Sequence, residues 1–226
     1  MRRKRLTKRE IKEDAFVTYS FRAIDFVKEH RSAVILGIAA LLVVIVGAGY
    51  ISSSRQASEE EAREQLLAGM LQQKAMSYRG AAAAYEDVLS RHSGTKSAKL
   101  ALLYLGHVRY ELGQYEEAIA HYQRYLDKEK SDKLTISQAK RGLAACMENT
   151  GRYEEAAELY ENNARSLDVG DHVPEDLMSA ARCRRLAGDT DAAMEILQEI
   201  IDTYPKYREV ELAKVYLAEL EYGSSD

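Results

Sequence analysis

The chain has 226 residues, of which 46% are hydrophobic and 30% are charged, and its formal net charge is −4. An apolar fraction this high excludes a disordered chain. The chain holds 13 Gly and 2 Pro, which mark too few turns for an all-β fold, and its 2 Cys are too few for a disulfide scaffold. The composition therefore predicts a mostly helical protein.

An uncharged stretch of 23 residues separates Arg31 from Arg55, and residues 33–51 (AVILGIAALLVVIVGAGYI) are almost wholly apolar. A helix of that length spans about 28 Å, close to the hydrocarbon thickness of a bilayer. A buried helix of a soluble core rarely runs this long without a polar residue, and a cleavable signal peptide has a shorter apolar run. We therefore expect residues 33–51 to form a retained transmembrane helix.

Charge is distributed unevenly on the two sides of this stretch. Residues 1–32 contain ten Lys or Arg and five Asp or Glu, a net charge of +5, which leaves −9 for the rest of the chain. The positive-inside rule then predicts a single-pass protein of the bacterial inner membrane with a cytoplasmic N-terminus and a periplasmic C-terminal domain. The basic run MRRKRLTKR is also compatible with nucleic-acid binding. Attraction to anionic lipid headgroups is the simpler interpretation beside an anchor, so we expect a lipid partner and no nucleic acid.

The segment before the anchor has helical periodicity. Phe16, Tyr19, Ala23, Phe26 and Val27 recur at spacings of three and four residues and so share one helical face. This pattern predicts an amphipathic helix at the cytoplasmic membrane interface, within a basic head of residues 1–32. The alternative is a solvated tail that happens to be periodic.

The remainder of the chain contains an internal repeat. Residues 105–126 (LGHVRYELGQYEEAIAHYQRYL) and 143–164 (LAACMENTGRYEEAAELYENNA) share Gly-x-Tyr-Glu-Glu-Ala at a separation of 38 residues, and weaker copies precede and follow them at offsets of 37. The pattern predicts helical hairpins in which a small residue of the first helix allows the second helix to approach. These small residues are Gly69, Gly106, Ala144 and Ala181. The turns of the later hairpins carry Gly113, Gly151 and Gly188, which adopt left-handed backbone conformations without steric cost. A large residue of the second helix fills the space between neighbouring hairpins: Tyr85, Tyr122, Tyr160 or Leu197.

This pattern resembles the tetratricopeptide repeat (TPR) family, although the period here is 37–38 residues instead of 34, the family's Trp is absent and its junction Pro occurs only at Pro205. The resemblance implies an all-α fold, with one N-terminal transmembrane helix followed by a TPR-like α-solenoid of about four helical hairpins plus a capping helix. The expected divisions are 1–32 (head), 33–51 (anchor), 52–61 (linker), 62–221 (solenoid, with repeats 62–98, 99–136, 137–173 and 174–210 and a cap at 211–221) and 222–226 (tail). Helices are expected at about 62–76, 79–92, 98–112, 115–128, 134–150, 153–166, 174–187, 190–203 and 208–221.

Residues that could carry chemistry are sparse. The five His form no HExxH or i, i+4 pair, and the chain has no P-loop, G-x-S-x-G or dinucleotide motif. The Glu pairs at 116–117 and 154–155 open helices, where carboxylates favour the positive end of the helix dipole. We therefore expect no catalytic residue, metal, cofactor or small-molecule substrate, and a protein that is not an enzyme. Cys146 and Cys183 occupy equivalent places in adjacent repeats, about 10 Å apart, so we expect two buried free thiols.

The TPR resemblance implies that protein partners bind on the concave surface lined by the first helix of each hairpin. The family's groove positions fall on twelve residues, here called the groove residues: Leu66, Met70, Gln73, Leu103, His107, Tyr110, Arg141, Ala145, Glu148, Met178, Arg182 and Arg185. This surface is apolar with a Tyr at one end and Arg-rich at the other, which suits peptide segments with some acidic character. The alternative is that these residues form ordinary solvated helix faces.

The order of a basic head, one anchor and an acidic repeat domain resembles the ancillary subunit of the bacterial Sec translocon. The stretch GTKSAKLALLYLGHVRYELGQYEEAIAHYQRYL is similar to that family's second repeat. The resemblance implies a periplasm-facing scaffold that associates with translocon subunits and hands emerging client chains to periplasmic chaperones. An envelope-assembly or cell-division coordinator is the alternative, because TPR coordinators of that kind also have repeats ending in Tyr-Pro, as at Tyr204 and Pro205. Those proteins usually lack an anchor.

Overall fold

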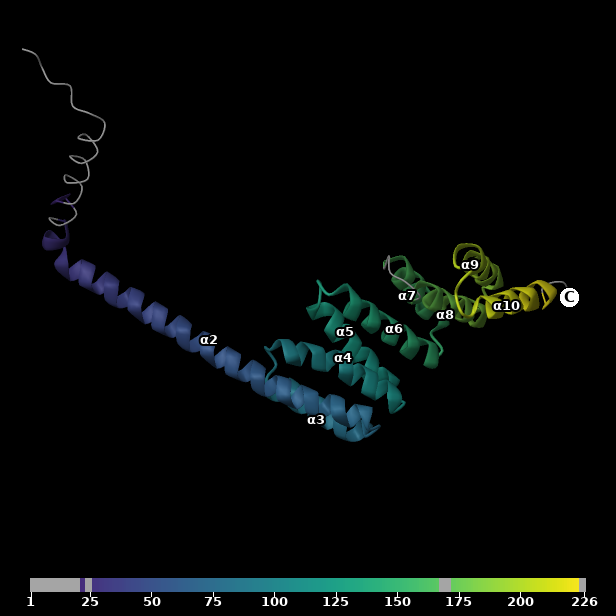
Figure 1. Ribbon diagram of the computed structural model, residues 1–226, viewed down its shortest axis with the longest axis horizontal. Coiled ribbons are helices and arrows are strands. Elements are labelled where there is room, and N and C mark those ends of the chain that lie inside the picture. Colours follow the sequence, from purple (N-terminus) through teal and green to yellow (C-terminus); the bar gives the residue numbers. More distant parts are fainter. Residues whose placement is uncertain (1–20, 23–25, 167–171, 224–226) are drawn as a thin grey trace, which may run out of the picture. The chain divides into compact units, whose positions relative to one another are not determined.

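The computed structural model describes residues 21–22, 26–166 and 172–223, and every regular element in these ranges is an α-helix. The chain separates into two units, Met1–Gln56 and Ala57–Asp226, which are described here one at a time. The helices are α2 (Arg31–Lys74), α3 (Tyr78–Arg91), α4 (Lys96–Glu111), α5 (Tyr115–Lys128), α6 (Lys133–Asn149), α7 (Tyr153–Ser166), α8 (His172–Ala187), α9 (Thr190–Thr203) and α10 (Val210–Gly223) (Figure 1).

In the first unit, α2 contains a stretch that is long and apolar enough to cross a membrane, and the most apolar part of that stretch is fully outside any core. Residues 52–61, the expected linker, are helical and belong to α2, because the sequence there has no Pro or Gly to end a helix. Of the predicted interfacial residues, Phe26 and Val27 are exposed. The other three, Phe16, Tyr19 and Ala23, lie outside the described residues.

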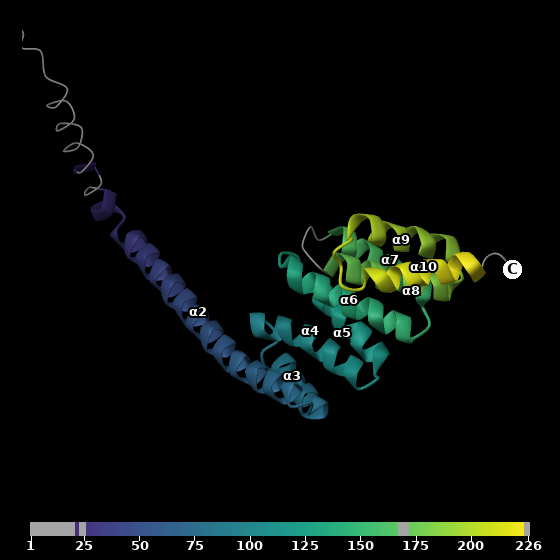
Figure 2. The ribbon, with the colours of Figure 1, turned by 45° about the vertical axis from the view of Figure 1, so that its right-hand side comes forward.

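The second unit is a stack of helical hairpins. The C-terminal part of α2 packs against α3, where Gly69 meets the ring of Tyr85. The pairs α4–α5, α6–α7 and α8–α9 follow in chain order, with α10 packed on α9 (Figure 2). The ends of α3 to α10 lie within two residues of the predicted ends. The predicted all-α solenoid of four hairpins with a final capping helix is therefore confirmed.

Left-handed turns close the hairpins where glycine was predicted. Gly113, Gly151 and Gly188 have φ of 72°, 77° and 87°. After the first of them, the amide of Gln114 donates to the carbonyl of Arg109 at 2.9 Å, the six-to-one bond of a Schellman cap. In the first hairpin the same place is taken by Met76, which has φ of 58° without being glycine.

Tyrosine rings pack against small residues of the first helices, as the repeat pattern predicts. A Cβ added at Gly69 would lie 2.5 Å from Cε1 of Tyr85, and one added at Gly106 would lie 2.7 Å from Cε1 of Tyr122. The ring of Tyr122 also touches the next hairpin, because a Cβ at Gly142 would lie 2.5 Å from its hydroxyl oxygen. Tyr122 therefore lies between α4 and α6 with a glycine on each side.

The buried side chains form two apolar clusters that meet in α4. The smaller cluster joins α2, α3 and α4, from Ala62 to Val108. The larger cluster extends from Leu102 in α4 to Ala213 in α10. Cys146 and Cys183 lie in the larger one as free, buried thiols, as predicted, and burial raises the pKa of each thiol to about 12.

Candidate functional site

The groove residues lie on the first helices of the four hairpins, but they are not equally accessible. Leu66, Leu103 and Met178 are 5%, 1% and 8% exposed, so they belong to the core beneath the surface. Met70, Arg182 and Arg185 are exposed, and the remaining six are partly exposed. The accessible part of the surface is therefore made by these nine residues.

At the N-terminal end of this surface, residues of α2, α3 and α4 line an open cavity of about 350 Å³. Two groove residues, Met70 and Gln73, line it together with Lys74, Tyr78, Tyr104 and Glu111. Tyr78 and Tyr104 are not among the predicted site residues. The sequence could have identified Tyr104 as a groove residue, because it stands three residues before His107 and so shares a helix face with it.

Aromatic rings lead from this cavity into the core, where Tyr85 and Tyr122 are buried and Tyr104 and His107 are partly exposed. The Tyr104 ring stacks on that of Tyr85 with centroids 5.8 Å apart, and His107 meets Tyr104 and Tyr122 edge to face at 6.2 and 5.5 Å. Burial lowers the pKa of His107 to about 4. The imidazole is therefore neutral near pH 7 and adds contact area, rather than charge, to this end of the surface.

Polar contacts tie neighbouring first helices together toward the C-terminal end. Asn149 on α6 donates to the hydroxyl of Tyr110 on α4 at 3.3 Å. Arg182 on α8 donates from Nε and Nη2 to both carboxylate oxygens of Glu148 on α6, at 2.7 and 2.9 Å. The positive charge of Arg182 is therefore already balanced by an acid on the neighbouring helix.

Arg141 has a similar structural role. Its Nε donates to the carboxylate of Asp176 at 2.6 Å, and Asp176 is 2% exposed. The other carboxylate oxygen of Asp176 accepts from Asn163 Nδ2 at 2.7 Å. A buried charge with a cation and an amide as partners is held firmly, and removal of one partner is costly. Of the three predicted arginines, Arg185 is thus the one that forms no ion pair with any described residue.

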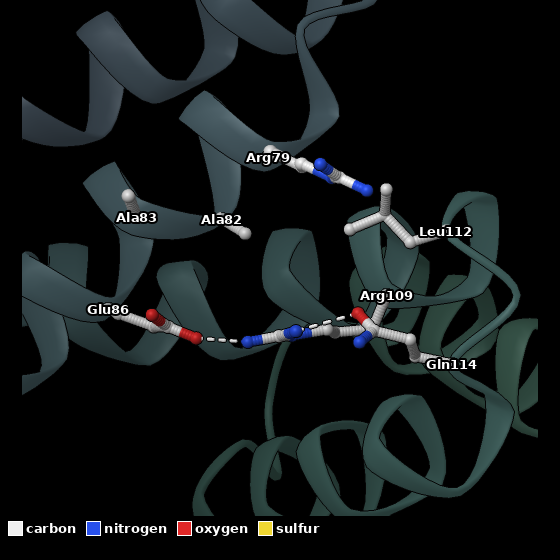
Figure 3. A pocket seen from close by; sticks show the side chains of 7 residues that line it. All are labelled: Arg79, Ala82, Ala83, Glu86, Arg109, Leu112 and Gln114. Carbon is white, nitrogen blue, oxygen red and sulfur yellow. Dashed lines mark hydrogen bonds and ion pairs between the residues drawn. The ribbon is translucent and has the colours of Figure 1, made fainter.

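A second cavity, of about 320 Å³, lies away from the groove residues, beside the turn between α4 and α5. Figure 3 shows the Arg109 side chain extended between Glu86 and Gln114, with which it forms an ion pair and a hydrogen bond of 2.6 Å. Because its guanidinium is used in this way, Arg109 connects α3, α4 and the start of α5. Its role is to join the first two hairpins.

No group of three His, Cys, Asp or Glu that could hold a metal ion occurs within the described part of the chain. The expectations of no metal, cofactor, catalytic residue or small-molecule substrate stay predictions. The groove itself likewise stays a prediction, now with its accessible and buried members distinguished.

Two segments match models of the tetratricopeptide repeat, residues 66–133 and residues 177–207. No curated protein matches the sequence. Among solved structures, a tetratricopeptide repeat protein from Parabacteroides merdae is 13% identical with a TM-score of 0.62, over 73% of this chain and 61% of that chain. The chain therefore spans less than two thirds of that protein.

Two further solved structures have a similar fold. The apo form of RapI is 15% identical with a TM-score of 0.63, over 73% of this chain and 49% of that chain. BtubC (BKLC) from P. vanneervenii is 18% identical with a TM-score of 0.59, over 77% of this chain and 83% of that chain. Identities this low carry the fold and no further property. The two matched segments are similar to tetratricopeptide repeats, and these solved structures share the fold of the helical hairpins.

Proposed function

We propose that this protein is a membrane-anchored, extracytoplasmic TPR scaffold that associates with the protein translocon and passes emerging chains to periplasmic chaperones. The observation that carries the proposal is the apolar stretch of α2, which precedes a solenoid similar to tetratricopeptide repeats in the chain. The charge of +5 before this stretch and −9 after it favours a cytoplasmic N-terminus. We expect membrane lipid to contact residues 33–51 and the basic head of residues 1–32.

The accessible groove residues support a role in binding extended, partly apolar segments. Met70, Tyr104 and the neutral His107 provide apolar contact area near one end, and the exposed Arg185 provides positive charge near the other. An unfolded chain leaving a translocon exposes both apolar side chains and acidic side chains. The scaffold would hold such a chain without needing a folded partner surface.

The anchor and its orientation are tested with a reporter enzyme that is active only outside the cytoplasm. We expect activity when the reporter follows Asp226, and none when it follows His30, before the apolar stretch. Loss of residues 33–51 should release the solenoid from the membrane fraction. A reporter that is inactive after Asp226 contradicts the proposed topology.

The partner is tested by photo-crosslinking in cells. A photoreactive amino acid is placed at Met70 or Arg185 on the first helices, and matched control positions are the exposed Gln123 on α5 and Glu195 on α9. We expect crosslinks to translocon subunits and to a stalled secretory chain from the first pair and not from the control pair. Crosslinks exclusively to division or outer-membrane assembly factors would support the alternative coordinator function and overturn the translocon proposal.

A further inference from the structure

The cavity of about 320 Å³ in Figure 3 lies at the seam between the first two hairpins and is here called the seam cavity. None of its lining residues is a groove residue. Two arginines line it, Arg79 from α3 and Arg109 from α4, together with one acid, Glu86. Two guanidinium groups at one cavity make it a candidate site for an anion.

The surplus of positive charge distinguishes this seam from the next two. At the corresponding lining positions of the second seam, one acid faces one base, and these two residues, Glu116 and Arg152, form an ion pair at 3.4 Å. At those of the third seam, Arg184 faces four acids, which are Glu154, Glu158, Glu161 and Asp189. The first seam is therefore the one of the three in which cations outnumber acids at these positions.

The two arginines of the seam cavity are held differently. Arg109 is 17% exposed, and its Nη1 donates to Gln114 Oε1 at 2.6 Å while its Nη2 donates to the carboxylate of Glu86. Arg109 is thus a fixed positive charge. Arg79 is exposed, and Figure 3 shows its side chain extended from α3 with no hydrogen bond or ion pair to the other lining residues. Within the cavity, the Arg79 guanidinium therefore keeps its donors for a ligand.

The rest of the lining selects among anions. Ala82, Ala83 and Leu112 present apolar groups, which suit the methylene groups of a glutamate side chain better than a bare inorganic ion. Glu86 repels a phosphate, with its charge of about −1.5 to −2, more strongly than a singly charged carboxylate. A carboxylate alone fills a small part of the seam cavity, so the segment that carries it can enter as well. These features favour an acidic side chain of another protein.

We propose that the seam cavity binds a glutamate side chain of a partner protein, with its carboxylate accepting hydrogen bonds from Arg79 and facing the fixed charge of Arg109. Its methylene groups then lie against Ala82, Ala83 and Leu112. This gives the repeat domain a second contact surface, formed by a second helix and the turn between α4 and α5. An acidic segment of a partner binds there while the groove residues stay accessible.

Peptide titration tests the ligand chemistry. The full chain, labelled with nitrogen-15 arginine, is reconstituted in lipid nanodiscs, and NMR follows its arginine amides. The probe is the peptide Gly-Ser-Ala-Glu-Ala-Ser-Gly, blocked at both ends so that glutamate supplies its one carboxylate. We expect saturable shifts of the Arg79 and Arg109 signals and no shift of Arg182 or Arg185. Glutamine in place of the glutamate should weaken binding at least about tenfold, because hydrogen bonds to a charged group are lost.

Variants of the protein test the location, with binding read from the Arg109 signal and folding checked by circular dichroism. Arg79→Gln should weaken binding of the glutamate peptide about tenfold and leave the glutamine peptide unaffected. Arg79→Glu introduces the residue type that the next two hairpins carry at this position, so the fold should tolerate it. It should abolish binding of the glutamate peptide and favour a peptide with lysine in its place. Ala83→Phe should abolish binding by filling the cavity without a change of charge. The control Arg91→Gln, at an exposed arginine of the same helix, should bind as the wild type does.

Absence of saturable shifts, equal affinity for the glutamate and glutamine peptides, unchanged binding by Arg79→Gln or Ala83→Phe, or shifts centred on Arg182 and Arg185 overturns the inference. Competition at equal ionic strength tests the choice of anion. Inorganic phosphate should displace the peptide less well than acetate, and stronger displacement by phosphate overturns the assignment to a carboxylate. Crosslinking from Met70 tests the proposed function separately. If peptide binding fails while translocon crosslinks persist, the seam inference alone is wrong, and the opposite pair of results leaves the seam inference standing without the translocon proposal.

Discussion

The glycines on either side of Tyr122 allow a quantitative test of how the repeats pack. In Gly142→Ala the new Cβ would lie 2.5 Å from the hydroxyl oxygen of Tyr122 and 2.8 Å from its Cε1. The ring is 1% exposed and has Gly106 close on its other side, so it has little room to retreat. Overpacking of this kind costs about 1–3 kcal/mol. The contacts under 3.0 Å place this cost in the upper half of that range, about 2–3 kcal/mol. The better helix propensity of Ala returns about 1 kcal/mol, so we expect a net destabilisation of about 1–2 kcal/mol.

A double-mutant cycle with Tyr122→Leu isolates the steric contact, because Leu is the residue at the equivalent position 197. Without the ring, Gly142→Ala should stabilise the chain by up to about 1 kcal/mol, through helix propensity alone. Thermal unfolding of the reconstituted protein, followed by circular dichroism, should show a fall of roughly 2–8 °C for the single Gly142→Ala variant. The reasoning is refuted if Gly142→Ala stabilises the wild-type background, or if the sign of its effect is the same in both backgrounds.

Three further outcomes are expected. Met76→Gly should raise stability by about 1 kcal/mol, measured by urea unfolding, because it relieves a left-handed backbone at a residue that is 76% exposed; Met76→Val should lower it. The depressed pKa of His107 means that the unfolded chain binds a proton below about pH 6.5 that the folded chain takes up only near pH 4. Stability should therefore fall between pH 6.5 and 4, by up to about 3 kcal/mol from this residue, and the fall should be smaller in His107→Gln. Cys146 and Cys183 should react slowly with a maleimide until urea unfolds the repeats, since buried thiols with raised pKa carry little thiolate; rapid labelling of the folded protein would contradict this.

The sequence was sufficient to predict the helices and their turns, because both depend on interactions between residues close together in the chain. Gly113, Gly151 and Gly188 mark left-handed turns, and the spacing of Gly106 before Gly113 identifies the helix face that admits a ring. Residues 52–61 were expected as a linker and are helical in the structure, because no residue there ends a helix.

The candidate site was harder to predict, because side-chain pairing between repeats decides which charges remain available. Arg182 pairs with Glu148 and Arg141 with Asp176, and both pairs join successive first helices. A repeat pattern gives equivalent positions but not the direction in which a long side chain turns. The same limit applies to Leu66, Leu103 and Met178, whose family positions did not show that this chain buries them.

The division of the core into two clusters has a mechanical consequence. Repeat arrays gain stability from contacts between neighbours, so separate clusters can open as separate cooperative units. The smaller cluster, from Ala62 to Val108, follows the apolar stretch along the chain, and the exposed Met76 turn joins its first two helices. Tension applied between the N-terminus and a bound partner reaches the smaller cluster first along the chain. We therefore expect the smaller cluster to unfold before the larger one.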